Sequence, residues 1–143
     1  MALTKDSPRH YSVIGVENVL PVQASSTVYA GSALSFDTGG EVGPLSASEA
    51  GFAGFGMSKS DNSSGSAGDI GARVLTEGEI ELVIAGLDDN NDLNDLVYAT
   101  DDDTFTLTAS GGVPIGRVSQ IVSLSANKAR VKFSSLSNEH PND

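Results

Sequence analysis

Apolar and polar residues alternate along two segments of the chain, as in β-strands that bury one face. In residues 79–84, isoleucine and leucine alternate with Glu79 and Glu81. In residues 128–133, alanine, valine and phenylalanine alternate with three cations, Lys128, Arg130 and Lys132. Both segments are predicted to be strands whose charged side chains point away from the core.

Other short apolar runs are separated by glycine, proline, asparagine and aspartate. Residues 27–36 predict one longer strand, and residues 104–108 and 115–118 predict two more. Residues 87–96 have leucines spaced for a single helical turn, and no segment keeps a helical period over three turns. Short strands with turn signals every 8–12 residues indicate an all-β sandwich or barrel.

The length predicts one domain, because the chain has 143 residues and a typical domain has about 150. Residues 1–11 are expected to form an extended N-terminal arm, since they are polar and Pro8 favours extended backbone before it. Residues 12–134 are expected to be the β-domain, and residues 135–143 a polar C-terminal tail. Residues 58–68, rich in serine and glycine, predict a flexible loop.

Charge narrows the possible partners. The net charge is −11 and the pI is about 4.3, which argues against direct nucleic-acid binding and against docking on anionic membranes. Ten acidic residues and no Lys or Arg lie between Glu77 and Asp103, while cations gather near the two ends. This dipolar layout suits contact with another protein. No stretch approaches the ~18 apolar residues of a membrane span, and the first residues lack the apolar block of a signal peptide.

Candidate catalytic chemistry is sparse, and we expect no enzyme and no cofactor. The two histidines, His10 and His140, lie near the chain ends, where a fixed catalytic geometry is hard to maintain. There is no cysteine, no Gly-x-Ser-x-Gly motif and no phosphate-binding loop. The five phenylalanines fall on apolar strand faces, which favours core packing over a sugar-binding platform.

One segment has a partial metal-binding pattern. Asp88, Asn90 and Asp92 match the first three ligand positions of a calcium loop. Leu93 and Ala99 then stand where the turn glycine and the closing glutamate belong. The segment is therefore interpreted as a solvated acidic loop, with a weak calcium site as the alternative. Asn62-Ser63-Ser64 also fits a glycosylation acceptor by pattern, which matters only in a secreted eukaryotic protein.

Two segments have both a structural and a binding interpretation. The cations at 128, 130 and 132 either protect an edge strand from aggregation or form a docking face for an acidic partner. The arm is either a loose terminus or a segment that becomes ordered by adding a strand to a partner.

Five short motifs, in this order, resemble the capsid cement (head decoration) proteins of tailed bacteriophages. Asn94 stands where the family's Gly-Asp-x-Val-Tyr turn has glycine. The resemblance spans Thr27 to Phe133, about three-quarters of the chain, and its motifs are Val28-Tyr29-Ala30-Gly31-Ser32-Ala33-Leu34, Phe52-Ala53-Gly54-Phe55-Gly56, Asp95-Leu96-Val97-Tyr98, Ile115-Gly116-Arg117-Val118 and Ala129 to Phe133.

The resemblance implies a compact β-tulip or β-sandwich-like domain that assembles as a homotrimer on the outer surface of the phage capsid. Its partner would be the major capsid protein, at threefold and quasi-threefold positions, and its function would be to hold the shell against internal DNA pressure. The expected capsid-binding residues are Lys5, Arg9, His10, Tyr11, Lys128, Arg130 and Lys132. The alternatives are another virion structural protein, such as a tail-tube ring, and a carbohydrate- or cell-surface-binding β-module.

Overall fold

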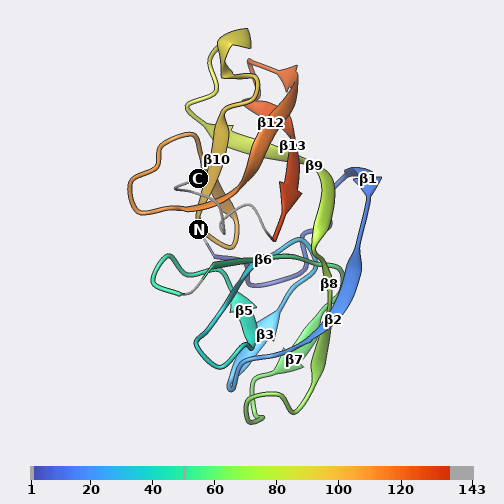
Figure 1. Cartoon of the computed structure of the whole chain (residues 1–143). Coiled ribbons are helices and arrows are strands. Elements are labelled where there is room, and N and C mark those ends of the chain that lie inside the picture. The colour runs from blue at the N-terminus through green and yellow to red at the C-terminus, as the bar shows by residue number, and fades with distance from the viewer. Residues whose placement is uncertain (1, 50, 136–143) are drawn as a thin grey trace.

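The structure, a computed structural model, describes residues 2–49 and 51–135, and its regular secondary structure is almost entirely β-strand (Figure 1). The all-β prediction is confirmed. The strands are β1 (Tyr11–Ile14), β2 (Glu17–Pro21), β3 (Ser26–Val28), β4 (Ala33–Phe36), β5 (Val42–Pro44), β6 (Gly51–Gly56), β7 (Ser60–Asn62), β8 (Gly71–Leu75), β9 (Glu77–Ala85), β10 (Leu96–Asp101), β11 (Thr104–Thr106), β12 (Val113–Ser123) and β13 (Lys128–Ser134). A 3₁₀ turn, η1 (Asn90–Asp92), lies where one helical turn was expected.

The second half of the chain closes into a five-stranded barrel. Its strands follow the order β9-β11-β10-β12-β13, and β13 pairs back to β9. Strand β1 is added to the outside of this closed ring through its pairing with β9. A closed barrel leaves no open edge among its own strands, so β1 supplies the free edge of this sheet.

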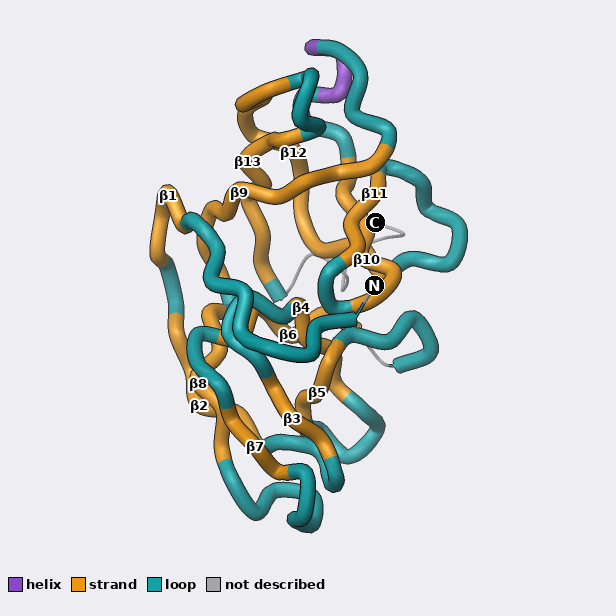
Figure 2. The backbone as a smooth tube through the Cα atoms, turned by 180° about the vertical axis from the view of Figure 1, so that it is seen from behind, coloured by secondary structure: helices purple, strands orange, loops and turns teal. Residues whose placement is uncertain are grey.

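The first half forms a five-stranded sheet in the order β2-β8-β6-β4-β5, with a small β3–β7 pair beside it. The barrel and this sheet lie at opposite ends of the molecule in two opposed views (Figures 1 and 2). Strands β8 and β9 are separated only by Thr76, so one stretch of chain runs from the sheet into the barrel. Residues 11–21 run alongside it, with β1 on the barrel and β2 on the sheet.

Two apolar clusters hold these layers together, and phenylalanines dominate the larger one. Phe52 and Phe55 of β6 make edge-to-face contacts with Phe133 of β13, with ring centroids 6.1 and 4.9 Å apart. Phe105 packs on Phe55. The expected core role is confirmed for these four rings, while Phe36 is partly buried against the smaller cluster.

The single strand expected at residues 27–36 is wrong, because the chain breaks at Gly31. Gly31 has a φ of 87°, far from the extended backbone of a strand. The segment becomes β3 and β4, which belong to different sheets. The alternation of apolar and polar residues could not reveal this break, because Gly31 and its two neighbours, Ala30 and Ser32, are all buried.

The loop expected to be flexible at residues 58–68 is anchored by Asn62, which is 3% exposed. The Asn62 side-chain amide donates hydrogen bonds to the carbonyl oxygens of Gln23 and Ser66, each at 3.0 Å. Residues 60–62 also form β7, paired with β3. The prediction of a flexible loop is therefore wrong for the part of the segment that Asn62 and β7 hold. Asn62, the asparagine of the glycosylation pattern, is buried in the folded chain.

The described part of the chain contains no helix long and apolar enough to cross a bilayer. At its C-terminal end, the Ser135 amide donates to the Thr76 carbonyl at 2.9 Å. The rest of the expected tail, including His140, lies outside the described residues.

Candidate functional site

The basic strand at residues 128–133 lies inside the barrel sheet. Strand β13 pairs with β12 on one side and β9 on the other. Its apolar residues are buried and its cations point outward, as the alternation predicted. The interpretation of these cations as protection for an edge strand is wrong, because β13 is not an edge.

The cations of β13 face glutamates of the same chain. Arg130 is in register with Glu81 and Lys132 with Glu79 on the neighbouring β9. Lys128 Nζ lies 3.8 Å from Glu81 Oε1, a distance that gives a partly exposed pair little energy. These contacts lower the positive potential that an acidic partner would meet along most of the strand.

Arg117 extends this cationic surface and was missed in the sequence. It lies on β12 in register with Lys132, so both side chains share the outer face of the barrel. We call Arg117, Lys128, Arg130 and Lys132 the basic strip; it holds four of the chain's eight Lys and Arg residues. Arg117 and Lys132 are the exposed members. Register between distant strands brings them together, which single-segment periodicity does not reveal.

Polar contacts hold the two arginines of the strip. Arg117 Nη1 donates to the Asn94 carbonyl at 2.9 Å, and Asn94 itself has a φ of 71°. Asparagine tolerates this left-handed conformation, so Asn94 takes the place of glycine in this turn. Arg130 Nη1 donates to Gln120 Oε1 at 2.9 Å. Arg130 Nε is buried without a hydrogen-bond partner among the described residues.

The N-terminal arm lies against its own domain. The Ser7 amide donates to the Ala30 carbonyl at 2.8 Å, and Asp6 Oδ1 accepts from the Ala30 amide at 2.9 Å. The Leu3 amide donates to Asp102 Oδ1 at 3.1 Å. Hydrogen bonds at residues 3, 6 and 7 therefore hold the arm, and its interpretation as a loose terminus is wrong for these residues.

Arg9 is the centre of the arm's docking. Its Nε donates to the Gly31 carbonyl at 2.6 Å and its Nη2 pairs with Asp103 Oδ1 at 2.8 Å. The guanidinium also lies 5.1 Å from the centroid of the Phe105 ring, within cation–π range. A Cβ at Gly31 would overlap the Ser7 carbonyl oxygen, so the arm fits only over a glycine.

Of the other expected arm residues, Lys5 and His10 are exposed and Tyr11 belongs to β1. The His10 carbonyl accepts from the Glu81 amide at 3.0 Å, which continues the pairing of β1 with β9. The Tyr11 ring packs against the larger apolar cluster. Burial raises the pKa of Tyr11 to about 12, and the nearby Arg9 charge opposes this only partly.

Asp102 is the most buried acid in the described chain, at 1% exposure. Its Oδ1 accepts from Leu3 and its Oδ2 from the Ser32 hydroxyl at 3.0 Å. Burial raises the pKa of Asp102, while these two donors act in the opposite direction. The carboxyl group links the arm, the residue before β4 and the β10–β11 turn.

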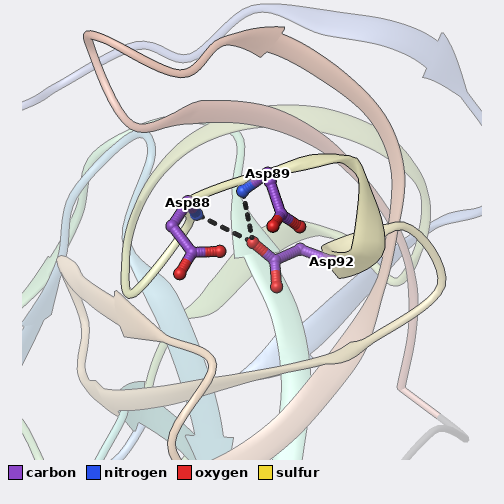
Figure 3. A group of neighbouring side chains, drawn as sticks. All are labelled: Asp88, Asp89 and Asp92. Atoms are coloured by element: carbon purple, nitrogen blue, oxygen red, sulfur yellow. Dashed lines mark hydrogen bonds between the residues drawn. The ribbon is translucent and has the colours of Figure 1, made fainter.

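The acidic turn at Asp88, Asp89 and Asp92 is the one cluster of metal-ligand type in the described chain (Figure 3). Its carboxylates close the turn themselves: Asp92 Oδ2 accepts from the amides of Asp88 at 2.8 Å and Asp89 at 3.2 Å. Asp89 Oδ1 accepts from the Asn91 amide at 2.7 Å, capping η1.

Neighbouring charges and hydrogen bonds shift the pKa values of two aspartates in this turn in opposite directions. The negative charges of Asp92 and Asp89 raise the pKa of Asp88, and the two backbone donors lower the pKa of Asp92. Asn90, which filled one position of the calcium-loop pattern, is the first residue of η1. The arrangement is that of a capped turn whose own carboxylates accept the backbone hydrogen bonds.

A shallow depression of about 290 Å³ lies beside the barrel. It is lined by Val83, Ile84, Ala85, Asp103, Thr104, Phe105 and Asn127. Its one carboxylate, Asp103, is already paired with Arg9, so the depression offers little to a substrate.

No family model, no curated protein and no solved structure matches this chain.

Proposed function

We propose that this chain is a structural protein of the virion that binds the outside of a phage capsid. It would bind as a homotrimer at threefold and quasi-threefold positions of the major capsid protein. Binding only the expanded shell would stabilise that shell by linkage, since a ligand favours the state to which it binds. No catalytic step is part of this function.

The convergence of the resembling motifs in space carries the proposal. The motif at 115–118 lies in β12, the motif at 129–133 in β13, and the motif at 95–98 leads into β10. These three are consecutive strands of the barrel, and β6, with the motif at 52–56, packs against β12 and β13. Segments scattered over the sequence therefore form one structural unit.

The roles of the charged groups also support a binding function. Asp102 and Asp103 hold the arm, and Asp89 and Asp92 close a turn. These acids therefore have structural partners within the chain, and none is left as a pair poised for catalysis.

The expected capsid-binding residues differ in how accessible they are. Arg9 and Tyr11 are engaged within the chain, so capsid contact through them would require the arm to leave its site. Lys132, together with Arg117, is exposed without that rearrangement. We assign the capsid-facing contact to this end of the basic strip.

The first test is the mass of the purified protein by light scattering on a sizing column. A trimer, at three times 14.6 kDa, supports the proposal. A hexameric ring would favour a tail-tube role, and a monomer that binds glycans would favour the carbohydrate-binding alternative.

The second test is co-sedimentation with bare expanded capsids of the phage that encodes the chain. Lys132→Glu and Arg117→Glu should each weaken binding, most strongly at low salt, because they reverse exposed charges of the proposed contact. Lys59→Glu is the matched control, since Lys59 is an exposed cation that lies over the Tyr29 ring, away from the strip. Equal binding by all three variants and the wild type would exclude the strip as the capsid contact.

A further inference from the structure

Residues 13–19 are exposed without interruption, although they lie in and between two strands. Four are β-branched aliphatic residues: Val13 is 53% exposed, Ile14 65%, Val16 48% and Val19 70%. Strand β1 ends the barrel sheet and β2 ends the five-stranded sheet. They follow each other along one side of the molecule in both opposed views (Figures 1 and 2). We call residues 11–21 the apolar edge.

The other sheet edges in the described part of the chain are protected. Strand β5 is three residues long and has Val42 and Gly43 buried. Strands β3 and β7 are equally short and mostly polar. The apolar edge is longer and lacks the lysines and central proline that commonly prevent edge pairing. Its composition also favours strand formation.

We infer that the apolar edge pairs with the same edge of a second copy of this chain, antiparallel, about a two-fold axis at Val16. A two-fold contact requires a self-complementary surface. With Val16 opposite Val16, each Val13 faces Val19 of the second copy, and each Ile14 faces Asn18. Each exposed valine of the edge in one copy then faces an exposed valine in the other copy. This inference stands on the edge alone and does not depend on the proposed function.

Charges beside the edge fit this register. Glu79 lies one strand inward from Val13, and Arg73 lies one strand inward from Val19. The facing valines therefore have Glu79 on one flank and Arg73, itself paired with Glu17, on the other.

The acid within the edge is already neutralised. Glu17 would face Gly15 of the second copy, and its carboxylate is paired with Arg73 through contacts of 3.0 and 3.3 Å. The net charge of −11 on each chain still opposes association, so added salt should strengthen the contact.

The absence of cysteine allows a direct test by disulfide trapping. In Val16→Cys the two thiols are self-opposed, within the reach of a disulfide, and oxidation should give a covalent dimer. Val83→Cys is the control: Val83 is 56% exposed but lies on β9, inside the sheet. Val13→Cys mixed with Val19→Cys should give the heterodimer in excess over either homodimer. Equal, slow cross-linking of Val16→Cys and Val83→Cys would overturn the inference.

The mass of an edge-blocked variant gives an independent readout. Val19→Lys places a charge on the exposed face of β2 and leaves the core untouched. The wild-type protein should have at least twice the mass of this variant, because each copy gains a partner through the edge in addition to any assembly that the variant keeps through other surfaces. Equal masses would overturn the inference. Equal masses together with loss of capsid binding by Val19→Lys would assign the edge to a strand of the capsid protein instead. If neither protein forms a trimer, that result counts against the proposed function only, because the inference concerns the edge contact.

Discussion

Asp102 accepts a hydrogen bond from the Leu3 backbone amide at 3.1 Å, which ties the start of the chain to the turn between β10 and β11. The two residues are 99 positions apart in the sequence. A carboxylate that is 1% exposed is costly to ionise. The contact therefore couples one of the arm's hydrogen bonds to the state of this buried acid.

Asp102→Asn tests this dependence. Burial raises the pKa of Asp102 in the folded protein. A raised carboxyl pKa contributes stability that is present at low pH and is lost as pH rises through the folded-state value. Asparagine keeps an acceptor oxygen for Leu3 without the buried charge. We expect the Asp102→Asn variant to unfold at an equal or higher temperature than wild type at neutral pH, with the difference disappearing on acidification. A large loss of stability at pH 7 would contradict this account.

Gly31→Ala tests the fit of the arm. Gly31 and Gly40 have nearly the same φ, 87° and 85°, so alanine is strained at both. A Cβ at Gly40 meets nothing within 4 Å, whereas at Gly31 it overlaps Ser7. We expect Gly40→Ala to lower the free energy of unfolding by about 1–2 kcal/mol. Gly31→Ala should cost at least about 2 kcal/mol more, because backbone must move.

The arm gives this comparison a second readout. In Gly31→Ala, trypsin should cleave after Lys5 and Arg9 faster than in wild type, because arm contacts protect backbone from proteolysis. Gly40→Ala should leave these cleavage rates unchanged. Equal effects of the two substitutions on stability and cleavage would show that arm contact is not what requires glycine at position 31.

Asn62→Asp tests the anchor of the 58–68 loop. The Asn62 amide donates to carbonyl oxygens only, so a carboxylate would face acceptors without a proton to offer. Asn62→Ala should lower the free energy of unfolding by about 1–3 kcal/mol, and Asn62→Asp by more. Denaturant unfolding measures both. Asn18→Asp is the control, because Asn18 is exposed and makes one long contact of 3.5 Å with Thr76; similar losses at 62 and 18 would refute the anchor.

The acidic turn should respond oppositely to two similar substitutions. The charges of Asp92 and Asp89 raise the pKa of Asp88, so Asp88→Asn should raise the melting temperature at neutral pH. Backbone donors lower the pKa of Asp92, a stabilisation that is present above its unfolded-state pKa and lost on acidification. Asp92→Asn should therefore lower the melting temperature at neutral pH. Calcium titration separates the two interpretations: a melting temperature that rises with calcium in wild type alone would favour the weak metal site.

Local alternation was enough to predict the strands that face solvent on one side. Isoleucine and leucine in β9, and alanine, valine and phenylalanine in β13, point inward because a strand exposes side chains with period two. The phenylalanine core followed from the same argument. The all-β class needed only the spacing of turns. These features depend on neighbours within a few residues, which the sequence displays directly.

Contacts between distant segments were decided by the tertiary structure. Strand β13 is interior because β9, far from it in the sequence, pairs with its second side, and Arg117 joins Lys132 only through the register of β12. Gly31 breaks a strand where the arm crosses it, and Asn62 is buried because nearby backbone offers it carbonyl oxygens. Sequence by itself determined which faces are apolar. Only the packing of the chain on itself decided which polar groups are enclosed and which apolar edge is left open.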